Sequence, residues 1–315
     1  MPSVVALFPG QGSQKPGMGK DLAAGIASAS DVFARADAAL GEPLSTLCFE
    51  GPADTLTLTH NAQPALLTHG AAVWAALAAA AGPHLVATAG HSLGEFTAWH
   101  AAGALTLEDA VRLVRRRGEL MYATGVTRPG AMAAILGDPS EPIDAICARA
   151  TADPDGGLVV AANYNCPGQV VISGEVAGVR KAMELLKAAG AKRAVELPVS
   201  GAFHSPLMAP ASAGLAEALA RVPFGKAAVP VCVNVSAEFE TEPDRGRSLL
   251  VEQLTAPVRW TQVITVLAAR FPDALFVEMG PGSVLTGLVR KIAPDVATAT
   301  CGTAAEVQAL IERLS

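Results

Sequence analysis

The stretch LVATAGHSLGE, residues 85–95, decides how this chain folds. Residues 85–89 form an apolar run of strand length that leads directly into the turn GHSLG (90–94), and a helical pattern begins at Glu95. The order strand, glycine-bounded turn and helix is typical of a parallel α/β sheet. Val4–Phe8 is a second such strand, and it runs into the glycine-containing turn PGQGSQ (9–14). We therefore predict an α/β fold.

The pattern changes after Gly130. We expect strands at 131–136, 158–162, 169–173 and 193–197, with helices at 141–150 and 176–189. This βαββαβ order is the ferredoxin-like arrangement. Strands expected at 229–234 and 274–278 then resume the α/β pattern. The sequence thus predicts a small domain, residues 129–198, inserted into a large domain formed by residues 1–128 and 199–315.

Composition excludes several classes of protein. Hydrophobic residues make up 51% of the 315 residues and charged residues 17%, which favours a compact chain over a disordered one. The net charge of −6 and the 4% of aromatic residues argue against nucleic-acid binding. No basic residue precedes the first apolar run, and the alanine-rich residues 71–81 are better explained by a buried helix than by a membrane span. We expect a cytoplasmic protein.

The five cysteines are scattered along the chain, and none forms a CxxC pair. This spacing indicates neither a disulfide framework nor a zinc site. We expect buried, reduced thiols and no metal.

The turn around Ser92 matches the G-x-S-x-G nucleophile elbow. The flanking glycines permit a sharp turn that lifts the serine away from the sheet, and the helix that follows points its N-terminal N–H groups at the reacting carbonyl. The alternative is a Gly-Ser turn that only starts a helix. Because the match lies between an expected strand and an expected helix, we favour a nucleophile.

A serine nucleophile needs a base, and the chain offers six histidines. His91 adjoins the serine and should point elsewhere, and His100 lies eight positions down the same helix, at about 12 Å. The three histidines before the turn have no accompanying motif. His204 lies in a loop bounded by glycine and proline that enters a helix, and we predict that it is the base.

Two further features accompany the elbow. The first turn could complete an oxyanion hole, with the N–H of Gln11 joining that of Leu93, although such turns are often only tight connections. Three arginines, residues 115–117, lie on a helix expected from about Thr106. We expect Arg115 and Arg116 to be solvated. Arg117 shares a helical face with Leu113 and Met121, so it should point inward and need a carboxylate partner.

Together these motifs resemble the malonyl-CoA:acyl carrier protein transacylases of fatty-acid synthesis and the acyltransferase domains of polyketide synthases. The matching stretches run in the family's order along nearly the whole chain: FPGQGSQ (8–14), GHSLGE (90–95), Arg117-Gly118 with Met121, NYNCPGQ (163–169), FHSPLM (203–208), Asn234-Val235 and EMGPG (278–282). The segment 201–204 is more similar to malonyl-selective polyketide domains than to the bacterial fatty-acid form.

The resemblance implies an α/β-hydrolase-like large domain, a ferredoxin-like insert and a cleft between them. Ser92 would carry the malonyl group, and His204 would act as base, oriented by the backbone carbonyl of Gln253. Gln11 and Leu93 would form the oxyanion hole, and Arg117 would bind the malonyl carboxylate. Further substrate contacts are expected from Met121, Phe203 and Asn163. The reaction would need no metal and no cofactor besides its substrate malonyl-CoA.

The expected partner is an acyl carrier protein supplied in trans to a monomeric enzyme. Carrier proteins are acidic, so a basic patch should receive them, although each candidate could equally be solvated surface charge. The candidates are Lys192, Arg193, Arg290 and Lys291.

Two other functions fit some of the residues. A serine hydrolase would use the same elbow and release the acyl group to water, but it has no use for a buried Arg117. A docking module that only keeps the fold would not need Ser92 and His204. Whether the carrier serves fatty-acid or polyketide synthesis stays open.

Overall fold

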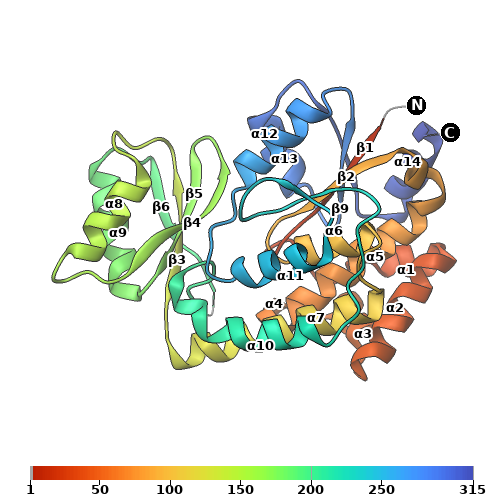
Figure 1. Ribbon diagram of the computed structural model, residues 1–315, viewed down its shortest axis with the longest axis horizontal. Coiled ribbons are helices and arrows are strands. Elements are labelled where there is room, and N and C mark those ends of the chain that lie inside the picture. The colour runs from red at the N-terminus through yellow and green to blue at the C-terminus, as the bar shows by residue number, and fades with distance from the viewer. Residues whose placement is uncertain (1–2, 200, 315) are drawn as a thin grey trace.

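Two separate β-sheets organise the computed structural model, which describes residues 3–199 and 201–314 (Figure 1). The first sheet has the spatial order β10-β9-β1-β2-β7-β8. Its strands are β1 (Val4–Phe8), β2 (Leu85–Gly90), β7 (Val231–Cys232), β8 (Phe239–Glu240), β9 (Leu275–Met279) and β10 (Ala297–Cys301). All neighbours pair in parallel except β7 and β8, which are antiparallel. The prediction of an α/β fold is confirmed.

Helices cover both faces of this sheet. Alternate residues of β1 contribute to different cores: Val4, Ala6 and Phe8 to one, and Val5 and Leu7 to the other. Because both faces are buried, the central strand is a continuous apolar run. The first face is covered by α1 (Lys20–Gly25), α2 (Ala27–Leu40), α3 (Leu44–Glu50), α4 (Ala53–Thr57), α5 (Thr59–Ala81), α6 (Gly94–Ala101), α7 (Leu107–Thr127), α10 (Ala209–Ala220), α11 (Pro243–Glu252) and α14 (Ala304–Leu314), and the second by α12 (Trp260–Arg270) and α13 (Val284–Ile292). Two short 3₁₀ helices are η1 (Gly82–His84) and η2 (Pro206–Met208).

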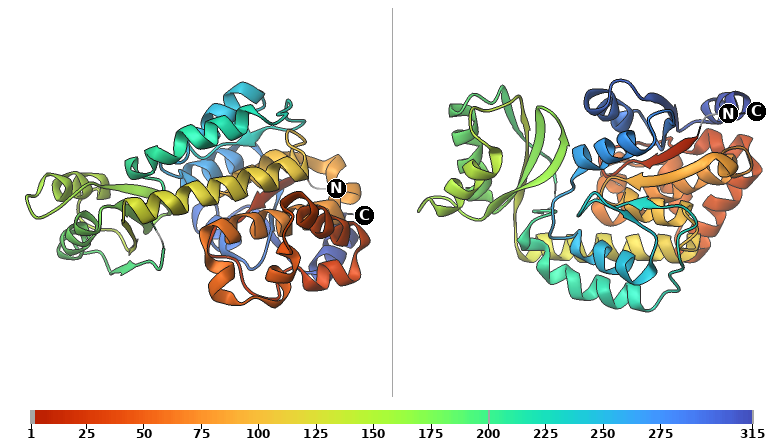
Figure 2. Two further views of the ribbon diagram at one scale, coloured as in Figure 1. Left: turned by 90° about the horizontal axis from the view of Figure 1, so that it is seen from below. Right: turned by 45° about the horizontal axis from the view of Figure 1, so that its top comes forward.

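The second sheet is antiparallel and has the order β4-β5-β3-β6. Its elements are β3 (Ala131–Leu136), α8 (Ile143–Ala152), β4 (Val159–Cys166), β5 (Gln169–Gly174), α9 (Val176–Ala188) and β6 (Arg193–Glu196). The two helices pack on the face that contains Ala133, Ile135 and Ile172. Figure 2 shows α7 extending from the first sheet toward this second sheet, with α10 returning beside it. The predicted βαββαβ order is therefore the observed one.

The long helix α5 is the only described segment with the length and hydropathy of a membrane span, when it is taken together with η1. Most of its apolar window is buried inside the protein. It packs against α2, α6, α7 and α14, so it is a core helix, as the alanine-rich sequence predicted.

Several element boundaries differ from the sequence prediction. Strand β7 has two residues, not six, because the chain turns at Val233, where the N–H of Ala237 bonds to the Val233 carbonyl. Helix α8 begins two residues late because Pro142 is its N-cap. Strand β10 was not predicted, since its residues ATATC carry no continuous apolar run.

The turn between β2 and α6 leaves no room for two side chains. A Cβ on Gly90 would lie 1.9 Å from the carbonyl carbon of Gly94, and a Cβ on Gly94 would lie 2.1 Å from the carbonyl oxygen of Phe8. Both obstacles are backbone atoms, so a rotamer change cannot relieve either clash. The two glycines let the start of α6 press against β1.

We predict that Gly94→Ala lowers the free energy of unfolding by about 3 kcal/mol or more, because the β1 backbone would have to move. Gly287→Ala is the matched control, since Gly287 is an exposed residue within α13 with no atom near its Cβ position. There the same substitution should stabilise by up to about 1 kcal/mol. Thermal unfolding of both variants measures the difference. An unchanged transition in Gly94→Ala would show that the turn is not this tightly packed.

Candidate active site

Ser92 lies at the tip of the turn after β2, in a left-handed backbone conformation with φ 53°. That conformation is unfavourable for a residue with a side chain, so its surroundings must hold it. Asn234 does so from the end of β7: its Oδ1 accepts the Ser92 N–H at 2.7 Å, and its Nδ2 donates to the Gly90 carbonyl at 2.7 Å. One amide side chain therefore clamps the turn at two points.

His204 meets Ser92 from a point 112 positions away in the chain. Its Nε2 lies 2.7 Å from Ser92 Oγ, and its Nδ1 lies 2.8 Å from the backbone carbonyl of Gln253. A carbonyl only accepts, so Nδ1 carries the hydrogen and Nε2 is left free to accept the serine proton. His204 also has a left-handed backbone, with φ 56°.

The imidazole of His204 is held neutral. Its side chain is buried, and this burial, together with the positive charge of Arg117, lowers its pKa to about 3. A neutral imidazole with a free Nε2 can act as a proton acceptor at every pH above that value.

Arg117 is fully buried, and its guanidinium also reaches the hydroxyl of Ser92. Its Nη1 donates to Gln63 Oε1 at 2.7 Å, and its Nη2 donates to Gln253 Oε1 at 2.9 Å and to Ser92 Oγ at 3.2 Å. These acceptors are neutral, so no carboxylate among the described residues contacts the guanidinium directly. Burial lowers the pKa of Arg117 to about 10, and the charge of Glu95 opposes that shift.

A pocket of about 560 Å³ opens over these three side chains. One wall comes from the elements around the first sheet and includes Gln11, Leu93, Met121, Phe203 and His204. The opposite wall comes from the second sheet, through Met132, Ala134, Asn163 and Val171. Every substrate-contact residue named from the sequence therefore lines one pocket.

The backbone N–H groups of Gln11 and Leu93 have no acceptor among the described residues. The side chain of Gln11 is anchored separately, because its Oε1 accepts from Thr59 Oγ1 at 2.8 Å. Two unpaired N–H groups beside Ser92 can receive a negatively charged oxygen.

Sequence reasoning missed the residues that hold this arrangement. Glu95 is buried, and its Oε2 accepts from the Asn234 N–H at 2.9 Å and from Gln253 Nε2 at 2.8 Å. Asn234 and Glu95 both fall within quoted motifs, which was the only signal available for them. Gln63 lies in α5, where nothing in the sequence marks it.

One further expectation is wrong. Arg115 is not solvated: its Nη1 donates to the His60 carbonyl at 2.7 Å and to Asn61 Oδ1 at 2.6 Å, and its Nη2 pairs with Glu42. It lies on the side of α7 that packs against the start of α5. Arg116 is exposed beside Glu119, as expected.

Two other histidines near the elbow have partners of their own. His91 Nε2 lies 2.9 Å from Asn165 Oδ1, and His100 Nδ1 lies 3.0 Å from the Leu105 carbonyl. All five cysteines are buried and free, and the described residues contain no cluster of three potential metal ligands.

The basic residues considered for docking lie in two places. Lys192 precedes β6 and packs over Gly137, and Arg193 begins that edge strand. Arg290 and Lys291 end α13. Arg290 Nε donates to Thr298 Oγ1 at 3.2 Å, whereas Lys291 is close enough to Cys166 for its charge to oppose the rise that burial causes in the pKa of that thiol.

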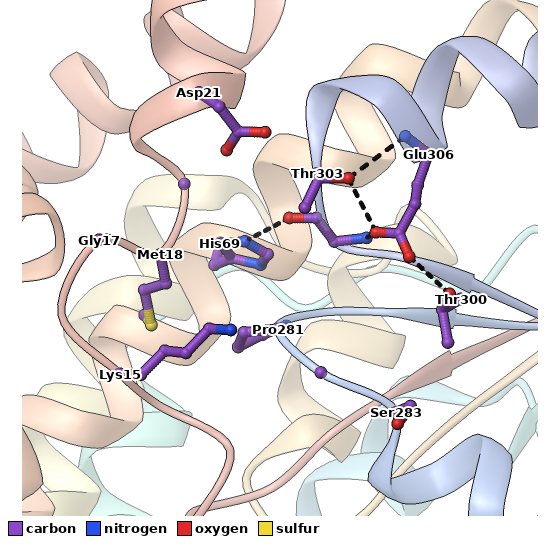
Figure 3. A pocket seen from close by; sticks show the side chains of 13 residues that line it. Lys15, Gly17, Met18, Asp21, His69, Pro281, Ser283, Thr300, Thr303 and Glu306 are labelled. Carbon is purple, nitrogen blue, oxygen red and sulfur yellow. Dashed lines mark hydrogen bonds between the residues drawn. The ribbon is translucent and has the colours of Figure 1, made fainter.

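A second pocket, of about 490 Å³, lies beyond the carboxyl ends of β9 and β10 (Figure 3). Lys15 extends across it toward Pro281, and His69 Nε2 lies 3.1 Å from the Gly302 carbonyl. Asp21 and Glu306 accept hydrogen bonds from backbone N–H groups at the start of α14. Its described lining contains no hydroxyl or thiol bonded to a histidine, whereas the pocket over Ser92 contains the contact between Ser92 Oγ and His204 Nε2.

Comparison with known proteins agrees with this geometry. The Acyl transferase domain family matches residues 5–310. The malonyl CoA-acyl carrier protein transacylase of Bacillus subtilis is 49% identical over 292 residues, which cover 93% of this chain and 91% of that protein. The acyl-carrier-protein-S-malonyltransferase structure from Bartonella henselae is 44% identical with a TM-score of 0.94, over 99% of both chains. A malonyl-transacylase solved with a type II polyketide acyl-carrier protein is 39% identical with a TM-score of 0.93, again over 99% of both chains.

The low pKa of His204 predicts how the reactivity of Ser92 depends on pH. For a histidine with an ordinary pKa of about 6.5, the neutral fraction falls roughly 30-fold between pH 7.5 and pH 5. Here the rate of labelling by a fluorophosphonate probe should change by less than about threefold over that range, because His204 stays neutral. His204→Ala should slow labelling by about 10²–10⁴-fold at every pH. A rate that halves near pH 6.5 would contradict this assignment.

Proposed function

The chain belongs to the acyl transferase family, among the malonyl CoA-acyl carrier protein transacylases, and from this premise we propose how its residues move a malonyl group from malonyl-CoA to an acyl carrier protein. The observation that carries the proposal is the convergence of three side chains. Ser92 Oγ lies 2.7 Å from a proton acceptor, His204 Nε2, and 3.2 Å from a cation, Arg117 Nη2.

The first half-reaction forms an ester on Ser92. His204 Nε2 accepts the hydroxyl proton while Oγ attacks the thioester carbonyl of malonyl-CoA. The carbonyl oxygen becomes an oxyanion that receives hydrogen bonds from the Gln11 and Leu93 N–H groups. When the intermediate collapses, the carbon–sulfur bond breaks, and the coenzyme A sulfur leaves with the proton from His204.

The second half-reaction reverses this chemistry with a different thiol. His204 accepts the proton of the carrier's phosphopantetheine thiol, whose sulfur attacks the malonyl ester. The carbon–oxygen bond to Ser92 breaks, and His204 returns the proton to Oγ. The Gln253 carbonyl keeps the imidazole in the required tautomer throughout, in the place that an acidic side chain takes in many serine hydrolases.

Arg117 selects the substrate by its charge. A malonyl group differs from an acetyl group by one carboxylate, which needs a fixed cation in a closed pocket. The guanidinium is already oriented by Gln63 and Gln253, and its Nε has no partner among the described residues. In the proposed complex the substrate carboxylate takes the place of Ser92 Oγ as an acceptor of the guanidinium, whose planar shape suits the two oxygens of a carboxylate.

The other lining residues shape the acyl site. Phe203 precedes His204, and its ring would crowd an α-methyl group, which favours malonyl over methylmalonyl. Met121 and Asn163 complete the walls on either side.

We assign the chain to two domains that together enclose this site. We assign residues 1–128 and 199–315 to an α/β-hydrolase-like domain, of which residues 1, 2, 200 and 315 lie outside the described structure. Residues 129–198 form a ferredoxin-like insert, an assignment supported by the βαββαβ element order and the strand order β4-β5-β3-β6.

The acyl carrier protein binds in trans to a monomeric, cytoplasmic enzyme that needs no metal or further cofactor. Lys291 is the strongest of the docking candidates, because Cys166 beside it bonds to Gln169, which lines the pocket. Lys192, Arg193 and Arg290 would extend this basic surface. Fatty-acid and polyketide carriers share the same phosphopantetheine chemistry, and both fit this site.

We predict that malonyl-CoA leaves a malonyl ester on the peptide that contains Ser92, detected as a mass increase, and that the steady-state kinetics are ping-pong. Ser92→Ala should abolish both. Without carrier protein, the release of coenzyme A should stop after about one equivalent, whereas continued release would indicate a hydrolase. An acyl group found on a cysteine would overturn the mechanism.

Arg117→Ala should lower kcat/KM for malonyl-CoA by roughly 10²–10⁴-fold, because removing one partner of a buried charge pair costs about 3–5 kcal/mol. Acetyl-CoA should gain relative to malonyl-CoA. Arg117→Lys should restore little, since an ammonium group cannot reproduce the planar pair of donors. Competitive loading of Ser92 from a mixture of both thioesters, followed by mass spectrometry, measures the preference. An unchanged preference for malonyl in Arg117→Ala would remove Arg117 from the proposal.

A further inference from the structure

Glu95 is a buried carboxyl group to which the reaction scheme above gives no task. It lies in the first turn of α6 with none of its surface exposed. Its Oε2 accepts two hydrogen bonds, and the indole N–H of Trp99 lies close enough to the carboxyl group to lower its pKa against the effect of burial. A carboxylate in this environment is costly, so its presence beneath the reactive centre calls for a compensating charge.

The compensating charge is Arg117, reached through a single amide. Gln253 Nε2 donates to Glu95 at 2.8 Å, and Gln253 Oε1 accepts from Arg117 Nη2 at 2.9 Å. The carboxylate fixes which end of the amide faces the guanidinium, because only the NH₂ end can donate to it. Glu95, Gln253 and Arg117 therefore form one buried unit with a negative end and a positive end.

A substrate carboxylate changes the charge of this unit. When Glu95 is ionised, one negative group and one positive group are buried together before binding. After a malonyl group binds beside Arg117, two negative groups share one cation in a closed site. Since like charges in a buried site raise each other's pKa, the arrangement favours protonation of Glu95.

We propose that Glu95 is the buried counter-charge of the malonyl site and takes up a proton when the malonyl carboxylate binds beside Arg117. The inference rests on the proposed role of Arg117. Proton uptake by Glu95 should make malonyl binding tighter at pH 6 than at pH 8, because a binding step that takes up a proton is favoured at low pH. Neutral acyl groups such as acetyl bring no second negative charge, so their binding is not coupled to the protonation of Glu95.

The other ionisable groups around Glu95 keep their charge between pH 6.5 and pH 8. Burial raises the pKa of Glu95 to about 7, so it alone titrates in this range. Arg117 stays positive with a pKa of about 10, and His204 stays neutral with a pKa of about 3. Burial lowers the pKa of His91 and raises that of Cys232 on β7, which keeps both neutral.

The test is isothermal titration calorimetry of the Ser92→Ala variant, which binds thioesters without reacting. Titrations at pH 7 in buffers of different ionisation enthalpy report the protons taken up. Malonyl-CoA should take up roughly 0.3–0.5 proton more than acetyl-CoA, since a group with a pKa near 7 is half protonated before binding. The acetyl-CoA titration corrects for the phosphates that both ligands carry.

Glu95→Gln in the same background should abolish the difference between the two ligands, since the amide keeps an acceptor for Gln253 but cannot ionise. Glu252→Gln is the matched control: it removes an exposed carboxylate next to Gln253 in the chain and should leave the difference intact. If Glu95→Gln does not fold, difference infrared spectroscopy of Ser92→Ala should still show a protonated carboxyl group appearing with malonyl-CoA and not with acetyl-CoA.

The outcomes separate this inference from the proposed function. Equal proton uptake for the two ligands, or a difference that survives Glu95→Gln, overturns the role of Glu95 even where Arg117→Ala weakens malonyl binding. Malonyl binding that is unaffected by Arg117→Ala overturns the proposed clamp itself.

Discussion

The hydrogen bond from His204 Nδ1 to the backbone carbonyl of Gln253 holds the reactive centre together. The same residue reaches Arg117 through its side-chain oxygen, and it reaches Glu95 and the Ser92 carbonyl through its side-chain nitrogen. The base, the cation and the nucleophile's turn are thus positioned by one residue at the end of α11. A carbonyl adds no full charge of its own. It orients the imidazole without the acid–base equilibrium that an aspartate would bring, and the neutral His204 follows from burial beside a cation.

This arrangement carries backbone strain at its two most reactive positions. Ser92 and His204 both adopt left-handed conformations, each unfavourable by about 1–2 kcal/mol for a residue with a side chain. The surrounding contacts offset that cost: Asn234 clamps one turn, and Ser205 Oγ, which donates to the Ala202 carbonyl at 2.7 Å, closes the other. These contacts and the bond from His204 Nδ1 to the Gln253 carbonyl limit the freedom of both residues, so the hydroxyl and the imidazole lie 2.7 Å apart in the absence of substrate.

Local patterns in the sequence were sufficient to predict much of the fold and to select the side chains that meet at Ser92. The elbow at Ser92, the loop at His204 and the helical face of Arg117 are each visible in a few consecutive residues. The groups that support them are not, because their partners lie far away in the chain: Gln63 and Arg117 are 54 positions apart, and Glu95 and Gln253 are 158. Arg115 was misjudged for a related reason. Three consecutive arginines look like a solvated surface until α5 is packed against one side of their helix.

The two sheets contribute differently to the site. In the proposed reaction, the first sheet and its helices provide the groups that move a proton or bind the substrate carboxylate, whereas the second sheet forms the facing wall of the pocket, through residues such as Met132 and Val171. Yet the second sheet is not loosely attached: the Val258 N–H donates to the Ala162 carbonyl, and the Tyr164 N–H donates to the Val258 carbonyl, which ties β4 to the segment before α12. Val258 lies five residues after Gln253, so the chain that orients His204 also fixes the wall that faces it. The segment 253–258 therefore sets both the width of the acyl pocket and the position of the His204 imidazole. A change in the backbone of this segment should alter both.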